Sequence, residues 1–346
     1  MTPASRDNFL PLRHLAAAMV IYGHAYALTR HPSDDVDLVQ RFMPGFYAGS
    51  LAVFFFFAIS GYLVTLSLLR QPSLLRYIRN RVVRIWPAYI VCILFCTLAI
   101  GLAWTTLTPA AYLHDRATLH FILGNAIPKS FVWTLPGVFA TNPYPNVVNG
   151  SLWSLGVEVR WYLWLGILAA LTLVRRPMAF TVVALAWIAW CAWQWWHGAP
   201  DARDVRALGC IFLGGGVCAV WRDRLPVTHV GMALLIMLAA LLHGSRWFGP
   251  VAAVAALHFC LWAAYRLPTL PWSRHIDWSY GLFLYGFPVE QSIAVWNPAI
   301  APLMMLVLAL IAASILAALS WHGIERPLLD RFKGKNASVD APLPAV

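Results

Sequence analysis

The sequence has few charged side chains, and acidic ones are the scarcest. Only 11% of the 346 residues are Asp, Glu, Lys or Arg, with 14 acidic residues against 25 basic ones. An ordinary soluble domain carries about 25% charged residues. Hydrophobic residues make up 60% of the chain. This composition excludes an ordinary soluble domain, and it predicts an all-α integral membrane protein with several membrane-spanning helices.

The sequence also lacks the cysteine spacing of a disulfide framework or a metal site. Its six cysteines all lie in apolar runs. Cys92 and Cys96 share a helix face, which the packing of two small side chains explains, so no bound metal is expected. No internal repeat is evident. The first apolar run lacks a small-residue cleavage site, and we interpret it as a helix rather than a cleaved signal peptide.

Ten apolar runs are long enough to cross a membrane. They lie near residues 11–29, 46–69, 85–107, 152–174, 177–197, 205–221, 226–242, 249–266, 277–296 and 300–322. The connections alternate in charge, and a cytoplasmic N-terminus puts most Lys and Arg on the inner side. We therefore expect about ten transmembrane helices with both termini cytoplasmic. The net charge of +11 then reports orientation, and no nucleic-acid partner is expected.

One long connection, residues 108–150, interrupts this regular pattern. Its stretch "LHFILGNAIPKSFVWTLPGVF" is apolar enough to span or to re-enter the membrane. Pro128 and Pro136 argue against a regular span, so we expect 118–140 to stay outside or to form a re-entrant or interfacial segment. The organisation expected is one transmembrane domain over 1–335 and a short cytoplasmic tail over 336–346.

The first predicted helix carries two polar groups, Arg13 and His24. Eleven residues are about three helical turns, so both side chains fall on nearly one face, roughly 16 Å apart. An arginine at a helix centre costs about 2.5–3.5 kcal/mol on insertion scales, and intramembrane ionisable groups are functional-site hypotheses by default. The structural alternatives are an arginine that snorkels and a histidine that hydrogen-bonds between helices.

Glu158 lies at the same predicted depth as His24. It is about six residues inside the outer end of the helix near 152–174, and His24 is about five residues inside its own. We predict a hydrogen-bonded pair in which the carboxylate fixes the imidazole tautomer. Such an imidazole suits a general base acting on a hydroxyl.

Three further patterns leave alternatives open. The segment 70–84, "RQPSLLRYIRNRVVR", suits anionic lipid, which charge alone favours, or a phosphorylated cytosolic cofactor. Ser60 and Gly61 in "FFFFAISGYLV" suit close helix packing or a slot beside a pore. The "EQ" of "FPVEQ", Glu290 and Gln291, is either substrate-facing or a polar helix end.

Six segments together resemble the membrane acyltransferase-3 family, whose members O-acylate carbohydrates and related acceptors. Arg13 and His24 match its Arg-x10-His signature. The other matching segments are "FFFFAISGYLV", "RNRVVRIWPAYIV", "VNGSLWSLGVEVRWYL" with Glu158 at the acidic position, "SYGLFLYGFPVEQ" and "WHGIERPLLDRF". The match covers essentially the whole chain. It departs at Gly286, where many members have His, and the length resembles the stand-alone form without an esterase-like domain.

The resemblance implies ten helices, an acyl-CoA donor from the cytosol, an acceptor at the outer face and essential roles for Arg13 and His24. The predicted function is transfer of an acyl group, expected to be acetyl from acetyl-CoA, to a hydroxyl of a carbohydrate or glycolipid. The expected location is the bacterial inner membrane. The alternative is a proton-coupled transporter or flippase of a glycan or glycolipid, against which the lack of paired repeats counts.

The predicted roles divide between chemistry and donor binding. His24 acts as general base or carries the acyl group briefly, and Glu158 orients His24 or the acceptor. Arg13 holds the donor or stabilises charge at the thioester oxygen. The predicted donor-binding residues are Ser60, Arg76, Arg79, Arg81 and Arg84. Acyl length and oligomeric state stay open.

Overall fold

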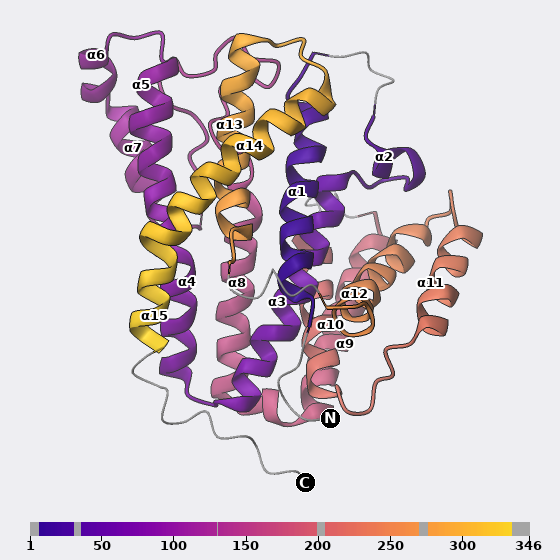
Figure 1. Ribbon diagram of the computed structural model, residues 1–346. Coiled ribbons are helices and arrows are strands. Elements are labelled where there is room, and N and C mark those ends of the chain that lie inside the picture. The colour runs from indigo at the N-terminus through magenta and orange to yellow at the C-terminus, as the bar shows by residue number, and fades with distance from the viewer. Residues whose placement is uncertain (1–6, 31–35, 130, 199–204, 270–275, 334–346) are drawn as a thin grey trace.

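The computed structural model describes residues 7–30, 36–129, 131–198, 205–269 and 276–333, and within these ranges it is helical without any strand (Figure 1). The main helices are α1 (Phe9–Ala27), α3 (Ala48–Arg70), α4 (Leu74–Phe95), α8 (Leu152–Ala170), α9 (Pro177–Trp196), α10 (Val205–Val220), α11 (His229–Leu241), α12 (Phe248–Arg266), α13 (Ser279–Trp296) and α14 (Pro302–Ser320). Each of the ten predicted ranges overlaps one of these helices, which confirms the all-α prediction for the described part.

Shorter elements complete the chain. They are α2 (Leu38–Phe42), α5 (Gly101–Trp104), α6 (Pro109–His114), α7 (Arg116–Gly124), α15 (Arg326–Lys333), the π-helical turns η1 (Cys96–Ile100) and η4 (Trp321–Glu325), and the 3₁₀ turn η2 (Leu173–Arg175). The two π-helical turns join α4 to α5 and α14 to α15, so each of these pairs forms one long continuous helix.

Five helices in the described part are long and apolar enough to cross a membrane. They are Ala48–Arg70, Leu74–Trp104, Pro177–Trp196, Phe248–Arg266 and Pro302–Phe332. Helices α1, α8 and α13 have similar lengths but carry Arg13, His24, Glu158 and Glu290, which lower their hydropathy. The chain is therefore a helical membrane protein whose polar residues are concentrated on particular helices.

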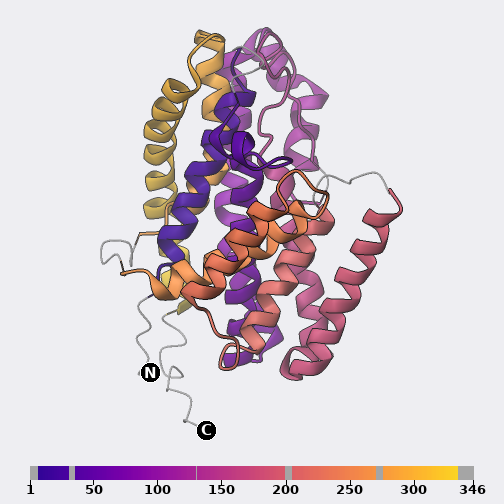
Figure 2. The same cartoon turned by 90° about the vertical axis from the view of Figure 1, so that its right-hand side faces the viewer.

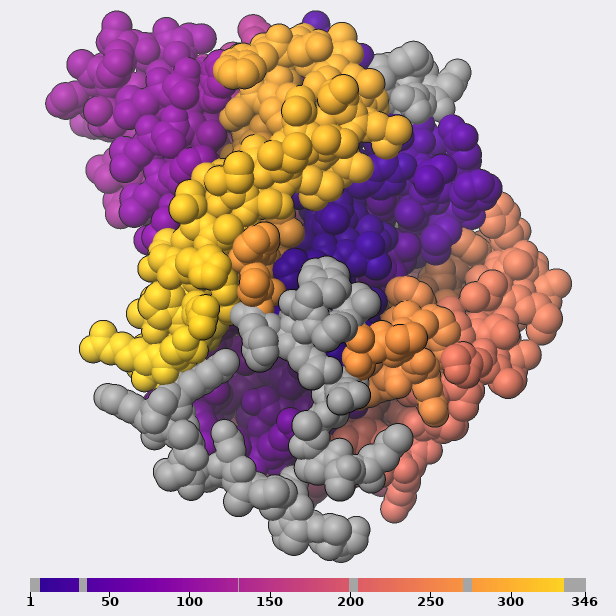
Figure 3. Space-filling view, in the orientation of Figure 1, coloured from indigo at the N-terminus to yellow at the C-terminus, as the bar shows by residue number. Residues whose placement is uncertain are grey.

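The helices with polar residues lie at the centre. Helix α1 packs against α3, α13 and α14, and α3 also packs against α10. Figure 3 shows α14 and α15, in orange and yellow, crossing this face of the molecule over α13 and α1. In the apolar window of α3, 78% of residues are buried, against 11% in α9, which stands at the right edge of Figure 2. Helix α3 is thus a core element, and α9 presents its apolar side chains outward.

The basic segment 70–84 differs from its predicted form. We expected a connection between two spans, but α4 begins at Leu74, where the Ser73 hydroxyl accepts a hydrogen bond from the Arg76 amide. A serine at this position caps a helix and satisfies one of its free amides. The predicted donor-binding arginines of this segment therefore lie on the first turns of a long helix, which fixes their directions relative to one another.

The connection 108–150 contains no spanning helix within its described residues. Its longest helix, α7, has nine residues. The part that follows folds back through backbone contacts, including the Val148 amide on the Trp133 carbonyl. This confirms that the segment is not a regular span. The tail 336–346 and the loop residues 31–35 and 270–275 lie outside the described residues.

Two glycines let α3 and α10 approach closely. A Cβ atom built on Gly61 would lie 2.0 Å from the Phe212 carbonyl oxygen, and one on Gly215 would lie 2.5 Å from that of Ala58. Small residues at such positions allow membrane helices to pack backbone against backbone. The contact matters for the site because Gly61 follows Ser60, so the position of Ser60 depends on it.

Replacing Gly61 should therefore disturb the core. We expect Gly61→Ala to lower stability by about 1–3 kcal/mol, because the methyl group would meet backbone that cannot move aside without separating the helices. Thermal unfolding of purified protein in detergent measures this. Gly249→Ala in α12 is the matched control, because nothing lies within 4 Å of its Cβ position. Equal melting temperatures for the two variants would contradict the packing argument.

Candidate functional site

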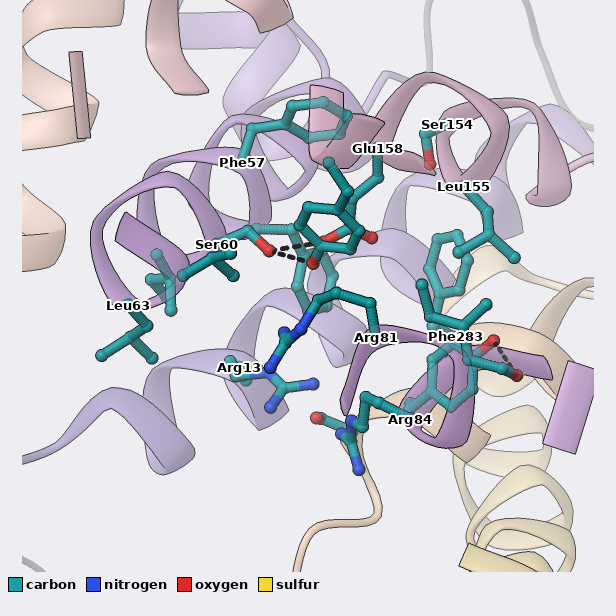
Figure 4. A pocket seen from close by; sticks show the side chains of 17 residues that line it. Arg13, Phe57, Ser60, Leu63, Arg81, Arg84, Ser154, Leu155, Glu158 and Phe283 are labelled. Carbon is teal, nitrogen blue, oxygen red and sulfur yellow. Dashed lines mark hydrogen bonds between the residues drawn. The ribbon is translucent and has the colours of Figure 1, made fainter. Parts of the chain in front are cut away.

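A cavity of about 110 Å³ lies among α1, α3, α4, α8 and α13, and we name it the charged cavity. Five predicted site residues line it: Arg13, Ser60, Arg81, Arg84 and Glu158. Figure 4 shows the three arginines grouped on one side of Ser60 and Glu158. The sequence motifs thus converge on one internal space, although they come from four different helices.

Asp277 and Glu325 compensate the positive charge beside this cavity. Asp277 Oδ2 lies 2.9 Å from Arg13 Nη1 and 2.6 Å from Arg84 Nη2. The second nitrogen of Arg84 lies 3.3 Å from Glu325 Oε2. Arg84 therefore bridges two carboxylates, one ahead of α13 and one in η4, with its side chain only 16% exposed. A guanidinium suits this position because its fork can serve two acceptors.

The ionisation of Asp277 follows from this arrangement. Asp277 lies ahead of α13, outside the helix. Burial alone would favour its protonated form, but Arg13 and Arg84 outweigh that effect and hold the pKa of this carboxyl well below its usual range. A depressed pKa contributes stability that is present above the ordinary range for Asp and is lost only on strong acidification. Asp277 is therefore a permanent anion at any neutral pH.

Glu158 is held by two hydroxyl groups. Ser60 Oγ and Tyr162 OH each donate to Glu158 Oε1 at 2.5 Å, and the two hydroxyls lie 2.6 Å apart. The Arg81 guanidinium stands 5.6 Å from the Tyr162 ring centroid. In the described part of the chain, Arg81 Nε is buried and has no hydrogen-bond partner. This corner of the cavity therefore has an anchored carboxylate and a cation with free donor capacity.

His24 does not line the charged cavity, and its carboxylate neighbour is not the predicted one. His24 Nδ1 lies 3.5 Å from Glu290 Oε2 of α13. The predicted pairing of His24 with Glu158 was wrong, because a similar depth in the membrane does not determine which side chains two helices turn toward each other. Helix α1 packs along α13, so the face that carries His24 meets Glu290, while Glu158 is engaged by Ser60 and Tyr162.

A second, larger cavity of about 640 Å³ follows the first, and we name it the aromatic cavity. Aromatic side chains dominate its lining, which includes Tyr47, Trp133, Tyr144 and Trp153, and none of its described lining residues is charged. The two cavities share α3 and α8 as walls. Along α3, Phe54 lines the aromatic cavity, and Phe56 and Phe57 line the charged one.

His24 lies near the aromatic cavity. Its ring contacts Phe287 with centroids 5.2 Å apart, and Phe287 contacts Tyr144 of the aromatic cavity at 6.2 Å. One helical turn before Phe287 on α13, Phe283 lines the charged cavity. A single aromatic ring, that of Phe287, therefore separates His24 from the aromatic cavity.

Two predicted donor-binding residues, Arg76 and Arg79, lie outside the described lining of the charged cavity. Arg76 Nη1 donates to Gln71 at 2.5 Å. The Arg79 guanidinium lies 5.8 Å from the Phe332 ring centroid, with Nε and Nη2 buried and unpartnered among the described residues. Both residues lie on the first turns of α4, the helix against which α15 packs (Figure 1).

Sequence reasoning missed several residues of the site. Tyr162, Asp277 and Glu325 were not proposed, and Glu290 was left open between two interpretations. The available signal was modest: Glu325 stands in "GIERP", and Glu290 follows a proline in a predicted helix. In the part of the chain that the structure describes, no group of three or more His, Cys, Asp or Glu could hold a metal ion.

The fold and the site define a helical membrane protein whose buried charged side chains gather around an internal cavity. The family model described as an acyltransferase domain matches residues 12–322. The chain belongs to this acyltransferase-3 family, which confirms the resemblance seen in the motifs, and the protein is an acyltransferase.

Two curated relatives cover nearly the whole chain. An "O-acetyl transferase" of Shigella phage Sf6 is 26% identical over 339 residues, covering 93% of this chain and 96% of the relative. "Nodulation protein 10" of Rhizobium leguminosarum bv. viciae is 28% identical over 358 residues, covering 94% and 93%. No solved structure matches the chain.

Proposed function

We propose that this protein is a membrane O-acetyltransferase. It moves acetyl from cytosolic acetyl-CoA to a hydroxyl of a carbohydrate or glycolipid at the outer side of a bacterial inner membrane. The proposed topology has ten spans and cytoplasmic termini, with one catalytic domain over 1–335 and a tail over 336–346. The observation that carries the proposal is the order of the two cavities along α3 and α8, a charged cavity followed by an aromatic one, with His24 one aromatic ring away from the aromatic cavity. The name of the phage relative supports acetyl as the group transferred.

The donor end is assigned from its unpartnered cations. CoA carries phosphate groups, and arginine forks match phosphate oxygens. Arg79 and Arg81 keep buried guanidinium atoms that no described residue satisfies, whereas Arg84 is committed to Asp277 and Glu325. Arg81 and Arg79 are therefore the proposed phosphate ligands. Arg84 stabilises the surrounding structure through its two carboxylate partners, and Arg76 lies about one turn before Arg79 on the same helix.

The other cavity residues position the reacting ends. Arg13 gives one nitrogen to Asp277 and keeps 26% of its side chain exposed, so its remaining donors can hold the donor near the thioester. Glu158, fixed by Ser60 and Tyr162, offers its second oxygen to a substrate donor group. With His24 turned toward Glu290, the proposed role of Glu158 narrows to orienting substrate.

The acceptor end is assigned from its aromatic surface. Trp133, Tyr144 and Trp153 provide apolar faces with polar edges, which can pack against a sugar ring while their polar groups hydrogen-bond its hydroxyls. The absence of charge among the described lining residues suits a neutral part of the acceptor. His24 then acts as general base, taking the proton of the acceptor hydroxyl.

The test of the function is transfer of radiolabelled acetyl from acetyl-CoA in inverted membrane vesicles. Label that enters a carbohydrate or glycolipid fraction only when the protein is present supports the proposal. If acetyl-CoA fails, longer acyl-CoAs test the acyl length. Solute movement driven by a proton gradient, with no covalent change and no acyl transfer from any of these donors, would support the transporter alternative.

Replacing Arg81 tests the donor assignment. We expect Arg81→Ala to raise the KM for acetyl-CoA about tenfold or more, because one charge-assisted contact to phosphate is worth about 1.5–3 kcal/mol. Donor titrations in the vesicle assay measure this. Arg175→Ala, an exposed arginine at the same end of the bundle, is the charge-matched control and should leave KM unchanged. Equal KM values for both variants would remove Arg81 from donor binding.

A further inference from the structure

Glu290 is a buried carboxyl group without a structural partner. Its side chain is 0% exposed, and neither oxygen has a hydrogen-bond partner in the described part of the chain. The next residue, Gln291, is equally buried but fully engaged. Its amide nitrogen donates to the Tyr144 and Val147 carbonyls, and its oxygen accepts from Asn142. Gln291 therefore holds the loop that carries Tyr144 and Val147 against α13, whereas Glu290, the residue before it, makes no such hydrogen bond.

The unpartnered carboxyl group faces His24. Glu290 Oε2 lies 3.5 Å from His24 Nδ1, and a shift of about 0.5 Å would bring the pair to ordinary hydrogen-bond length. His24 Nδ1 is itself buried without a hydrogen-bond partner. Nε2 is not one of the buried atoms without a partner, and the side chain keeps 13% exposure. The ring thus turns one nitrogen to Glu290 and leaves the other for a substrate.

No other charged side chain competes for this position among the described residues of α3, α13 and α14 that pack against α1 here. The polar groups nearest on the α3 side are phenolic or already engaged: Tyr47 stands beside Gly23, and both oxygens of Asp37 accept from backbone amides. Helix α14 carries no ionisable residue. The environment of His24 is therefore set by Glu290.

Burying a polar group without a hydrogen bond is unfavourable, and intramembrane carboxyl groups persist where they serve a function. We propose that Glu290 is a positioning residue: it accepts a hydrogen bond from His24 Nδ1 and so keeps Nε2 free as the base. This inference rests on the proposed role of His24. A carboxyl group that holds the far nitrogen of a catalytic imidazole also stabilises the imidazolium that forms during the reaction.

The proton balance of the step follows. His24 Nε2 takes the proton of the acceptor hydroxyl as its oxygen bonds to the thioester carbonyl carbon. When the carbon–sulfur bond breaks, His24 returns the same proton to the departing thiolate. Glu290 keeps its own protonation state throughout and stabilises the intermediate imidazolium. The side chain therefore affects the rate of the chemical step and has no contact with the donor.

Three substitutions separate positioning from structural support. In the vesicle assay with radiolabelled acetyl-CoA, we expect Glu290→Gln to lower kcat at least about tenfold while the donor KM stays within twofold. Glu290→Asp keeps the carboxyl group and should recover part of that loss. Glu290→Leu should be inactive yet raise the melting temperature by about 2 °C or more, since an unpaired polar group is replaced by an apolar one.

Gln291→Leu is the matched control, because it lies next to Glu290 and is equally buried. It should lower the melting temperature, since three partners lose their hydrogen bonds. Two results would overturn the proposal: a kcat for Glu290→Gln within twofold of wild type, or melting temperatures for Glu290→Gln and Glu290→Leu that fall as far as that of Gln291→Leu. Wild-type vesicles that transfer no label from any acyl-CoA would overturn the proposed function and this inference with it.

Discussion

Substituting His24 with alanine should abolish acyl transfer while leaving the protein folded. A positioned general base contributes about 10²–10⁴-fold, so we expect kcat to fall at least about 100-fold. The fold should survive, because no hydrogen bond joins the His24 ring to another residue in the described part of the chain, and its ring packs edge-on against Phe287. The measurement is transfer of radiolabelled acetyl from acetyl-CoA, normalised to the amount of monodisperse protein extracted in detergent.

His197→Ala is the matched control for this substitution. His197 is an exposed histidine just after α9 that lines neither cavity, and its ring nitrogen Nδ1 pairs with the Trp193 carbonyl. Its loss should leave the transfer rate unchanged. Transfer by His24→Ala at a near wild-type rate would remove His24 from the chemistry.

The largest effect on stability is expected for Arg84→Ala. This change removes the cation shared by Asp277 and Glu325, and the Glu325 side chain is only 3% exposed. Removing one partner of a buried ion pair costs about 3–5 kcal/mol, because the other charge stays behind without compensation. We expect a melting temperature lower by roughly 6 °C or more in detergent. The melting temperature of Arg84→Lys should lie between those of wild type and Arg84→Ala, because one ammonium group replaces a guanidinium that serves two acceptors.

An exposed ion pair provides the comparison. Arg326 and Asp330 lie one turn apart on α15 with Nε to Oδ2 at 3.5 Å, and both side chains are more than half exposed. Arg326→Ala should change stability by less than about 0.5 kcal/mol. If the melting temperatures of Arg84→Ala and Arg326→Ala were equal, the ion pairs of Arg84 with Asp277 and Glu325 would not stabilise the fold.

The helices were predictable from the sequence because long apolar runs have few alternatives in a membrane. All ten predicted ranges overlap a helix, and Pro128 and Pro136 marked a segment that is not a regular span. The start of α4 was misjudged because "RYIRNRVVR" reads as a hydrophilic connection. The Ser73 cap and the four arginines of this stretch are compatible with a helix, and local charge alone does not show where a helix begins.

The site was predictable in its residue types and less so in its partners. Arg13, Ser60, Arg81, Arg84 and Glu158 meet around one cavity, as their motifs suggested. The partner of His24 was missed because spacing along a helix gives depth and relative face, but not which neighbouring helix that face meets. That choice depends on how α13 packs along α1, which no single stretch of sequence encodes.

The four consecutive phenylalanines of α3 have a consequence for the cell that holds this enzyme. Phe54 borders one cavity and Phe56 and Phe57 border the other, so the wall between them is aromatic. An acetyl group on a thioester is small and uncharged and can approach such a wall. Hydrated ions and protons cannot pass a dry aromatic constriction at low cost. On the proposed function, the enzyme hands a metabolic group across the bilayer while the membrane keeps its proton-motive force.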